Sequence, residues 1–201
     1  MRCITASDCI LPWDIYPQRN TRWQFKQPQK LPAASPSNLG EMSPVGGAHS
    51  MIETPAAALM VAALAREVDF FSLGTNDLVQ YILVADRGDP AMEPYYHPAH
   101  PALLKIILSV IKAINPERNE LAICGEIAGD PFYIELLLGL GLRCFSVAPT
   151  EMLEVKNIIR SVSLAEAQKM AWQALTMSTG LEVEDFLEKR WQANYPLVRE
   201  I

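Results

Sequence analysis

The sequence lacks long apolar runs and basic clusters, and these two absences exclude whole classes of protein. No apolar stretch approaches the roughly 20 residues that a membrane-spanning helix needs, and the N-terminus lacks the apolar segment of a signal peptide. The net charge is −6 at pH 7, with no run of Lys or Arg. A basic patch is the usual mark of a nucleic-acid-binding protein. We therefore expect neither a membrane nor a nucleic acid as a partner.

The chain also lacks the cysteine spacing of a metal site. Its four cysteines form no Cys-x-x-Cys pair and no other zinc pattern; they are Cys3, Cys9, Cys124 and Cys144. We expect free thiols in a reducing, cytoplasmic setting. Cys144 begins an apolar stretch, and we interpret it as a core residue.

Regular periodicity is missing from residues 1–50. This segment holds six of the fifteen prolines and a net charge of +2, against −8 for residues 51–201. Segments rich in Pro, Ser and Gly with little hydrophobic pattern are typical of loops or disorder. We predict an irregular segment over residues 1–50 and a folded domain over residues 51–201, against which Trp13, Trp23 and Phe25 can dock.

From residue 51 onward, strand-like apolar stretches alternate with stretches of helical periodicity. This alternation predicts an α/β fold with a parallel sheet, whose strands have their carboxyl ends at one edge. Predicted strands end near residue 53 and cover 68–73, 121–124 and 144–148; predicted helices cover 56–67, 78–84, 101–114, 131–140, 151–160, 163–177 and 181–191. A closed (β/α)₈ TIM barrel needs eight strands. Four strands indicate half of one, the later half if the terminal helices end the domain.

The candidate site is organised around the stretch from residue 68 to residue 87. Its buried strand is broken by Gly74, and Asn76 and Asp77 then stand at the start of a helix. The free N–H groups of a helix start favour an anion such as phosphate, and Asp77 offers oxygen ligands beside it. Arg87 follows one helix later with a forked donor. A phosphate, a hard cation and an arginine are the parts of a phosphoryl-transfer site.

Other candidate groups also stand at predicted strand ends. Glu53 and Asp77 can together hold Mg²⁺, which takes one or two carboxylates plus substrate oxygens and water; the alternative is that both stabilise helix starts. Cys124 ends a strand before Glu126, and its thiol can move a proton with help from that carboxylate. The alternative is that it is a small core residue. Arg87 can equally pair with a neighbouring aspartate on the surface.

The three histidines carry no site in this interpretation. His97 and His100 flank Pro98 in a loop, with no group nearby to complete a triad or a zinc set, and we interpret both as structural. Residues 46–50, Gly-Gly-Ala-His-Ser, contain His49 and have the composition of a phosphate loop. No strand precedes this run and it is short enough to arise by chance, so we reject it as a site.

Five motifs occur in order between residues 51 and 160. They are Met51-Ile-Glu-Thr-Pro-Ala-Ala-Ala58, Glu67-Val-Asp-Phe-Phe-Ser-Leu-Gly-Thr-Asn-Asp-Leu-Val-Gln-Tyr81, Val84-Ala-Asp-Arg87, Cys124-Gly-Glu-Ile-Ala-Gly-Asp-Pro131 and Leu136-Leu-Leu-Gly-Leu-Gly-Leu142. Together they resemble the phosphoenolpyruvate-binding barrel of Enzyme I, the phosphoenolpyruvate–protein phosphotransferase of the bacterial sugar phosphotransferase system. Pyruvate phosphate dikinases and phosphoenolpyruvate synthases share the Asn-Asp-Leu and Cys-Gly cores, whereas Val-Asp-Phe-Phe-Ser and Gly-Glu-Ile-Ala-Gly-Asp look more like Enzyme I.

The resemblance implies a role for each candidate residue. Glu53 and Asp77 match the family's magnesium ligands. Asn76 and Arg87, beside Asp77, match groups that hold the phosphate of the substrate, and Cys124 matches the acid that protonates the methylene carbon of enolpyruvate. Loss of the phosphoryl group leaves an enolate that Mg²⁺ stabilises until a proton arrives. A thiol with an ordinary pKa of about 8.5 carries that proton at neutral pH.

Two parts of the family's pattern are missing. Its accepting histidine stands in a Gly-Gly-x-x-Ser-His context in a separate domain, and the first half of its barrel carries arginines that bind phosphate and carboxylate. Residues 1–50 match neither. We therefore expect a truncated Enzyme I-type phosphotransferase that is inactive alone and uses Mg²⁺. Its expected partners are phosphoenolpyruvate or pyruvate and, through the missing domain, the phosphocarrier protein.

Self-association is also expected, because a half-barrel has two open sheet edges and an inner face, near Phe71 and Ile123, that would meet water. Two alternatives to the phosphotransferase remain. One is a non-catalytic module that binds phosphoenolpyruvate and Mg²⁺ or forms dimers. The other is an enzyme of the pyruvate phosphate dikinase or phosphoenolpyruvate synthase type.

Overall fold

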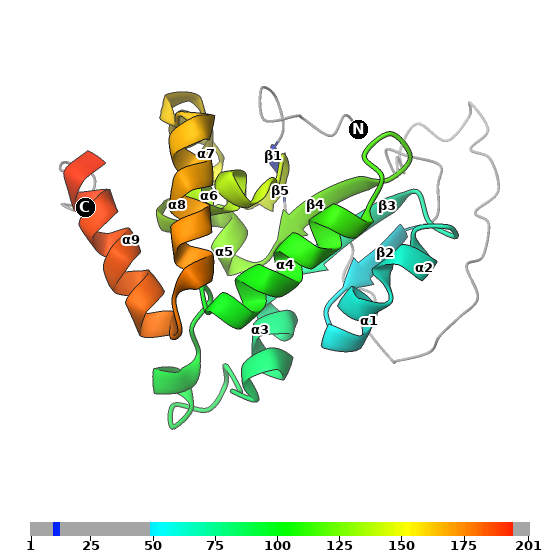
Figure 1. Ribbon diagram of the computed structural model, residues 1–201, viewed down its shortest axis with the longest axis horizontal. Helices are drawn as coiled ribbons and strands as arrows, with labels where there is room; N and C mark the ends of the chain where they lie inside the picture. The colour runs from blue at the N-terminus through cyan, green and yellow to red at the C-terminus, as the bar shows by residue number, and fades with distance from the viewer. Residues whose placement is uncertain (1–9, 13–48, 195–201) are drawn as a thin grey trace.

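A five-stranded parallel sheet forms the centre of the molecule. The computed structural model describes residues 10–12 and 49–194. The strands run in the order β1-β5-β4-β3-β2, and every neighbouring pair is parallel (Figure 1). Their bounds are β1 Ile10–Pro12, β2 His49–Ile52, β3 Phe70–Gly74, β4 Glu120–Cys124 and β5 Cys144–Val147. The predicted α/β class, the parallel sheet and its four strands after residue 48 are therefore confirmed.

Most of the segment predicted to be irregular lies outside the described residues, as do Trp13, Trp23 and Phe25. The two described parts of residues 1–50 both belong to the sheet. β1 pairs with the outer edge of β5, and β2 begins at His49. β1 and β2 are the two edges of the sheet in this part of the chain, and the sheet is open rather than closed.

Helices follow β2, β3, β4 and β5 in turn. They are α1 Pro55–Leu59, α2 Val61–Leu64, α3 Thr75–Leu83, the 3₁₀ helix η2 Glu93–Tyr95, α4 Pro101–Ala113, α5 Glu126–Gly129, α6 Pro131–Leu140, α7 Met152–Ser161, α8 Leu164–Thr176 and α9 Gly180–Asn194. None of the described helices is long and apolar enough to cross a membrane.

Side-chain caps fix two of the predicted helix starts. Thr54 Oγ1 accepts the backbone N–H of Ala57 at 3.2 Å, and Asp130 Oδ1 accepts that of Phe132 at 2.9 Å. Each cap satisfies an N–H that has no partner within its helix. The start of α8 was also predicted, but the Ser163 side chain makes no capping hydrogen bond there.

One predicted helix is interrupted, and two glycines near the end of another differ in their roles. The helix predicted over residues 56–67 is divided at Met60, whose φ and ψ of −94° and 5° separate α1 from α2. Gly141, with a φ of +115°, ends α6, but Gly139 lies inside that helix. A Cβ on Gly139 would overlap the carbonyl oxygen of Ala167, so this glycine allows α6 to pack closely on α8.

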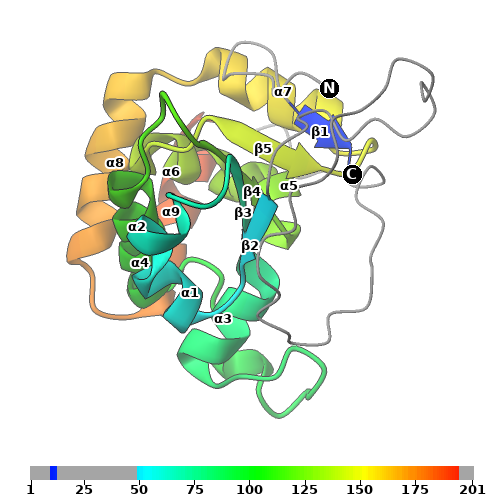
Figure 2. The same ribbon diagram turned by 90° about the vertical axis from the view of Figure 1, so that its right-hand side faces the viewer.

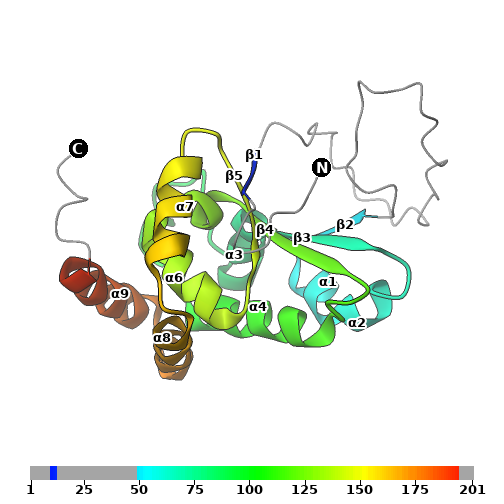
Figure 3. The same ribbon diagram turned by 90° about the horizontal axis from the view of Figure 1, so that it is seen from above.

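One face of the sheet forms the core. Leu73, Ile123 and Phe145 lie side by side across β3, β4 and β5, and all three are fully buried at 0% exposure. Figures 2 and 3 show α1, α4, α6 and α8 gathered on this side of the sheet. Burying these side chains between sheet and helices is the main source of stability for such a layer.

The opposite face carries smaller and more polar side chains. Ser72, Ala122 and Cys144 lie side by side across the same three strands. Phe71 and Ile123, which we predicted on the open inner face, belong instead to the helix-covered core and are fully buried. That prediction is wrong because β3 is apolar at consecutive positions, so its sequence does not show which alternate residues point to the helices.

The cysteine predictions hold only in part. Cys144 is buried in β5, as expected of a core residue, but it is held in a disulfide. The prediction of a free thiol is therefore wrong for this residue. Cys124 is a free cysteine, and Cys3 and Cys9 lie outside the described residues.

Candidate active site

The carboxyl ends of β2, β3 and β4 gather the predicted site residues at one edge of the sheet. Glu53 directly follows β2, and Cys124 ends β4. Asn76 and Asp77 lie in the first turn of α3, where backbone N–H groups have no partners within the helix. Gly74 lies at the junction of β3 and α3, and its lack of a side chain lets Glu53 pack against the backbone there. A Cβ on Gly74 would lie 2.5 Å from Glu53 Cγ.

Two carboxyl groups meet at this edge. Burial raises the pKa of Glu53 first, and the charge of Asp77, with a hydrogen bond between the two side chains, raises it further. A cation placed beside Glu53 and Asp77 would favour the ionised form of Glu53. No group of three or more His, Cys, Asp or Glu side chains within residues 10–12 and 49–194 forms a metal centre. The pair still fits Mg²⁺, which takes one or two carboxylates and completes its shell with water and phosphate oxygens.

Cys124 contributes a thiol that stays protonated. Its side chain is 8% exposed, and its Sγ donates to the carbonyl oxygen of Leu73 at 3.2 Å. Burial, followed by the charges of Glu53 and Asp77, raises the pKa of Cys124 to about 12. At neutral pH the side chain is therefore an S–H donor beside two carboxyl groups.

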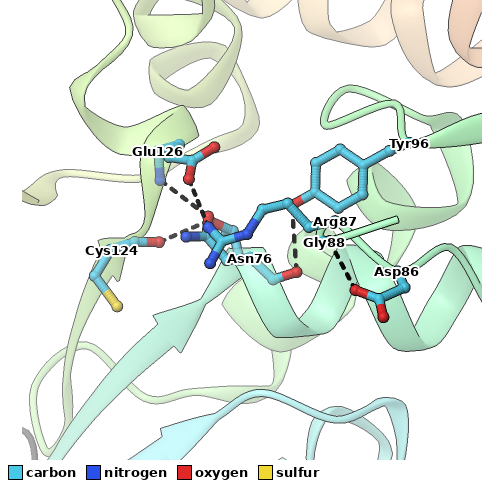
Figure 4. Close-up of polar contacts among 8 residues, drawn as sticks. Asn76, Asp86, Arg87, Gly88, Tyr96, Cys124 and Glu126 are labelled. Carbon is cyan, nitrogen blue, oxygen red and sulfur yellow. Dashed lines mark hydrogen bonds and ion pairs between the residues drawn. The ribbon is translucent and has the colours of Figure 1, made fainter. Parts of the chain in front are cut away.

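The turn from β4 into α5 packs directly on the first turn of α3. Thr75 Oγ1 donates to the carbonyl oxygen of Cys124 at 2.7 Å. The backbone N–H of Glu126 donates to Asn76 Oδ1 at 3.0 Å (Figure 4). Gly125 makes this approach possible, because its φ is +101° and a Cβ on it would overlap Thr75 Oγ1. Because Asn76 Oδ1 accepts this hydrogen bond, the two N–H donors on Asn76 Nδ2 are not used in it.

Arg87 reaches the site from the loop that follows α3. The helix ends at Val84, whose φ of 53° turns the chain back. Arg87 Nη1 donates to Glu126 Oε1 at 2.5 Å, and the two side chains are 50% and 69% exposed. The neighbouring aspartates that could pair with Arg87 are Asp86 and Asp89; they accept instead from the backbone N–H groups of Gly88 at 2.7 Å and Ala91 at 2.9 Å.

The expected help of Glu126 to Cys124 is not supported. Figure 4 shows the sulfur of Cys124 pointing away from Glu126, whose carboxylate faces Arg87. The charges that raise the pKa of Cys124 belong to Glu53 and Asp77.

Tyr96 belongs to the site and escaped the sequence reasoning. Its hydroxyl donates to the backbone carbonyl oxygen of Asn76 at 3.4 Å, across 20 positions of sequence. Burial, and then the charge of Glu126, raises the pKa of Tyr96, while Arg87 lowers it. The group therefore remains a neutral phenol near the same charges. The Pro-rich loop that carries it has no periodicity that would assign its side chains to a partner.

The histidines make structural contacts. His97 Nδ1 lies 3.0 Å from Glu184 Oε1 and links the loop to α9. His100 caps α4 by accepting a backbone N–H at 3.1 Å. His49 Nε2 lies 3.1 Å from Ser72 Oγ. The contacts of His97 and His100 agree with the structural interpretation, which stays a prediction.

A groove of about 630 Å³ lies between α6, α7 and α9, away from these strand ends. Its lining includes Asp130, Tyr133, Glu154, Glu184 and Trp191, and none of the predicted site residues. The candidate site is thus a polar surface at the sheet edge, separate from this groove.

Comparison with known proteins decides the family. The family model described as "PEP-utilising enzyme, PEP-binding domain" matches residues 32–164. The chain belongs to this family. PEP is phosphoenolpyruvate, so the resemblance carried by the five motifs is confirmed.

Similar proteins bear the name phosphoenolpyruvate-protein phosphotransferase. The chain is 44% identical over 138 residues to the protein of Buchnera aphidicola subsp. Acyrthosiphon pisum. It is 43% identical over 139 residues to that of Listeria monocytogenes and 45% identical over 139 residues to that of Mycoplasma pneumoniae. Each match covers 69% of this chain and 24% of the relative. The chain thus spans about a quarter of the length of the curated relatives that it matches.

Proposed function

We propose that this PEP-binding domain takes part in phosphoryl transfer from phosphoenolpyruvate to a protein histidine, as in Enzyme I of the bacterial sugar phosphotransferase system. The observation that carries the proposal is the protonated Cys124 thiol beside Glu53 and Asp77, at the edge where Asn76 begins a helix. The names of the relatives support the same reaction. In this proposal the domain binds phosphoenolpyruvate and protonates the enolate that remains after transfer.

The phosphate of phosphoenolpyruvate binds at the start of α3. Backbone N–H groups of the first helical turn favour an anion, as does the positive end of the helix dipole. Asn76 adds its amide donors, and Arg87 adds a guanidinium that suits two phosphate oxygens at once. Because Arg87 is half exposed, it can turn toward the ligand without breaking core contacts.

Glu53 and Asp77 hold Mg²⁺ in this proposal. Their proximity, seen in the raised pKa of Glu53, supports a site that a divalent cation completes. When bound, Mg²⁺ neutralises negative charge on the phosphate and on the enolate oxygen. The two side chains would hold the cation near the first turn of α3, where Asp77 lies.

Cys124 is the proposed acid. Phosphoryl transfer breaks the bond between phosphorus and the enol oxygen and leaves the electron pair on the enolate of pyruvate. The methylene carbon then forms a C–H bond with the thiol proton, and the S–H electron pair stays on sulfur. In the ligand-free site, a pKa of about 12 makes this thiol a weak acid. Neutralising Glu53 and Asp77 removes two of its three causes, so the loaded site holds a stronger acid.

The open sheet is, in this proposal, the later half of a (β/α)₈ barrel. Parallel strands followed by helices, with the polar residues at the carboxyl ends, support this interpretation. β1 pairs with the outer edge of the last strand, β5, which is where the first strand of a closed barrel would lie. The accepting histidine and the phosphocarrier protein that receives the phosphoryl group are partners supplied from elsewhere.

Exchange of the pyruvate methyl protons with solvent deuterium isolates the step assigned to Cys124, because it needs no accepting histidine. In D₂O with Mg²⁺, we expect the purified chain to deplete the methyl proton resonance of pyruvate. Cys124→Ala should abolish this exchange. Binding of phosphoenolpyruvate to the same variant, measured by titration calorimetry, should stay within about twofold of wild type.

Three outcomes separate the hypotheses. Exchange that survives in Cys124→Ala contradicts the assignment of the acid. Phosphoenolpyruvate binding without exchange by the wild-type chain favours the non-catalytic binding module. Absence of any binding contradicts the proposal as a whole.

A further inference from the structure

The loop between α3 and α4 is anchored at both ends and touches the site between them. Ala85 and Ala99, near its two ends, are fully buried at 0% exposure. Between these anchors, Arg87 reaches back to the first turn of α5 and Tyr96 to the first turn of α3 (Figure 4). The loop therefore lies against the site.

Glu126 joins both groups that are proposed to hold the phosphate. Its backbone N–H donates to Asn76 Oδ1 at 3.0 Å, and its carboxylate accepts from Arg87 Nη1 at 2.5 Å. The first contact uses only the backbone, so it survives a change of side chain. The second depends on the negative charge of Glu126.

The contact between Glu126 and Arg87 is exchangeable. The two side chains are 69% and 50% exposed, and an ion pair so open to water is weak and screened by salt. A guanidinium fork suits a phosphate as well as a carboxylate, and a phosphate carries more charge. The Arg87 guanidinium cannot make its full set of hydrogen bonds to the Glu126 carboxylate and to a phosphate at the same time.

We propose that Glu126 is a positioning residue that regulates phosphate binding at this site. Its carboxylate holds Arg87 at the start of α5 before a ligand binds and yields Arg87 to the phosphate of the incoming ligand. The carboxylate therefore competes with the ligand, while the backbone N–H of Glu126 keeps the Asn76 amide in place. Tyr96 keeps the loop docked on α3 while Arg87 changes partner. This inference rests on the proposed binding of phosphoenolpyruvate.

Glu126→Gln tests the competition, because it preserves the shape and the backbone N–H and removes the charge. Titration calorimetry with phosphoenolpyruvate and Mg²⁺ should show affinity about three- to tenfold higher than wild type. Glu93→Gln is the matched control. It removes a carboxylate from an exposed position on the same loop, in η2, and should change affinity by less than about twofold.

The Arg87→Ala background shows whether the gain depends on a shared arginine. There, Glu126→Gln should raise affinity by less than about twofold, because no guanidinium remains to compete for. An equal gain in affinity with and without Arg87 would show that Glu126 acts only by repelling the ligand's negative charge. That result would overturn the proposal. So would weaker binding by Glu126→Gln at an unchanged melting temperature. Failure of both wild type and Glu126→Gln to bind phosphoenolpyruvate would instead reject the proposed function itself, and this inference with it.

Discussion

Replacing Gly125 with alanine would test how closely the turn after β4 must pack on α3. Gly125 has φ and ψ of 101° and 177°, a region that residues with a Cβ rarely enter. The added methyl group would overlap Thr75 Oγ1 and lie 2.8 Å from Asn76 Oδ1. The substitution therefore strains the backbone and displaces two side chains of the candidate site.

The expected destabilisation is the sum of two effects. Backbone strain in this region costs about 1–3 kcal/mol, and losing the hydrogen bond from Thr75 to the Cys124 carbonyl adds about 1 kcal/mol. A total of about 2–4 kcal/mol lowers the melting temperature of a domain of this size by roughly 5–15 °C. Displacement of the Asn76 amide should also weaken phosphoenolpyruvate binding about tenfold.

Thermal unfolding followed by circular dichroism measures the first effect, and titration calorimetry measures the second. Gly88→Ala is the control, because a Cβ there meets only Asp86 Oδ1, at 3.3 Å on an exposed turn. It should leave the melting temperature within about 2 °C of wild type. If Gly125→Ala has the same melting temperature as Gly88→Ala, the turn after β4 is not packed on α3 as tightly as described.

Four further predictions follow from the same contacts. Burial and Asp77 raise the pKa of Glu53 in the folded chain. Between the pKa of Glu53 in the unfolded chain and its higher pKa in the folded chain, the folded state therefore binds more protons than the unfolded state. Above both pKa values, ionised Glu53 lowers the stability of the fold. Metal-free Glu53→Gln should therefore melt roughly 1–3 °C higher than wild type at pH 7, with the gain fading as pH falls through the raised pKa. Asp77→Ala should remove the weak binding of Mg²⁺ or Mn²⁺, and identical calorimetric titrations of variant and wild type would contradict its role as a ligand. Radiolabelled phosphoenolpyruvate should leave no acid-labile label on this chain, because none of its histidines stands in the Gly-Gly-x-x-Ser-His context of the accepting residue; a labelled band would reopen His49, His97 and His100. Since β2 is an edge strand in the described part of the chain, we expect self-association, and a compact monomer in sedimentation at micromolar concentration would refute this.

Strand positions and the edge that carries the site were predictable because both follow from local pattern. β3 is an apolar run stopped by Gly74, and the strand was placed within a few residues of its observed bounds. Parallel strands put their carboxyl ends at one edge, so residues directly after β2 and β3 had to be neighbours. The structure places Glu53 beside Asp77, and Cys124 within range of both charges.

Contacts that depend on the return of a loop were not predictable. Arg87 and Glu126 are 39 positions apart, and no periodicity links a Pro-rich loop to the start of a four-residue helix. Tyr96 was missed for the same reason. The face of β3 that carries Phe71 was assigned wrongly, because all five residues of the strand are buried and alternation gives no signal.

The balance of charge at this edge argues that phosphoenolpyruvate and its cation bind together. Glu53, Asp77 and Glu126 place three carboxyl groups around the start of α3, and Arg87 is already paired with one of them. An anionic phosphate approaching this surface meets repulsion that the helix start alone, worth about 0.3–1 kcal/mol, does not offset. A divalent cation between Glu53 and Asp77 would neutralise this excess negative charge, and it would also lower the cost of ionising the nearby thiol. We therefore expect phosphoenolpyruvate to bind this edge far more weakly when no divalent cation is present, which titration calorimetry with and without Mg²⁺ would measure.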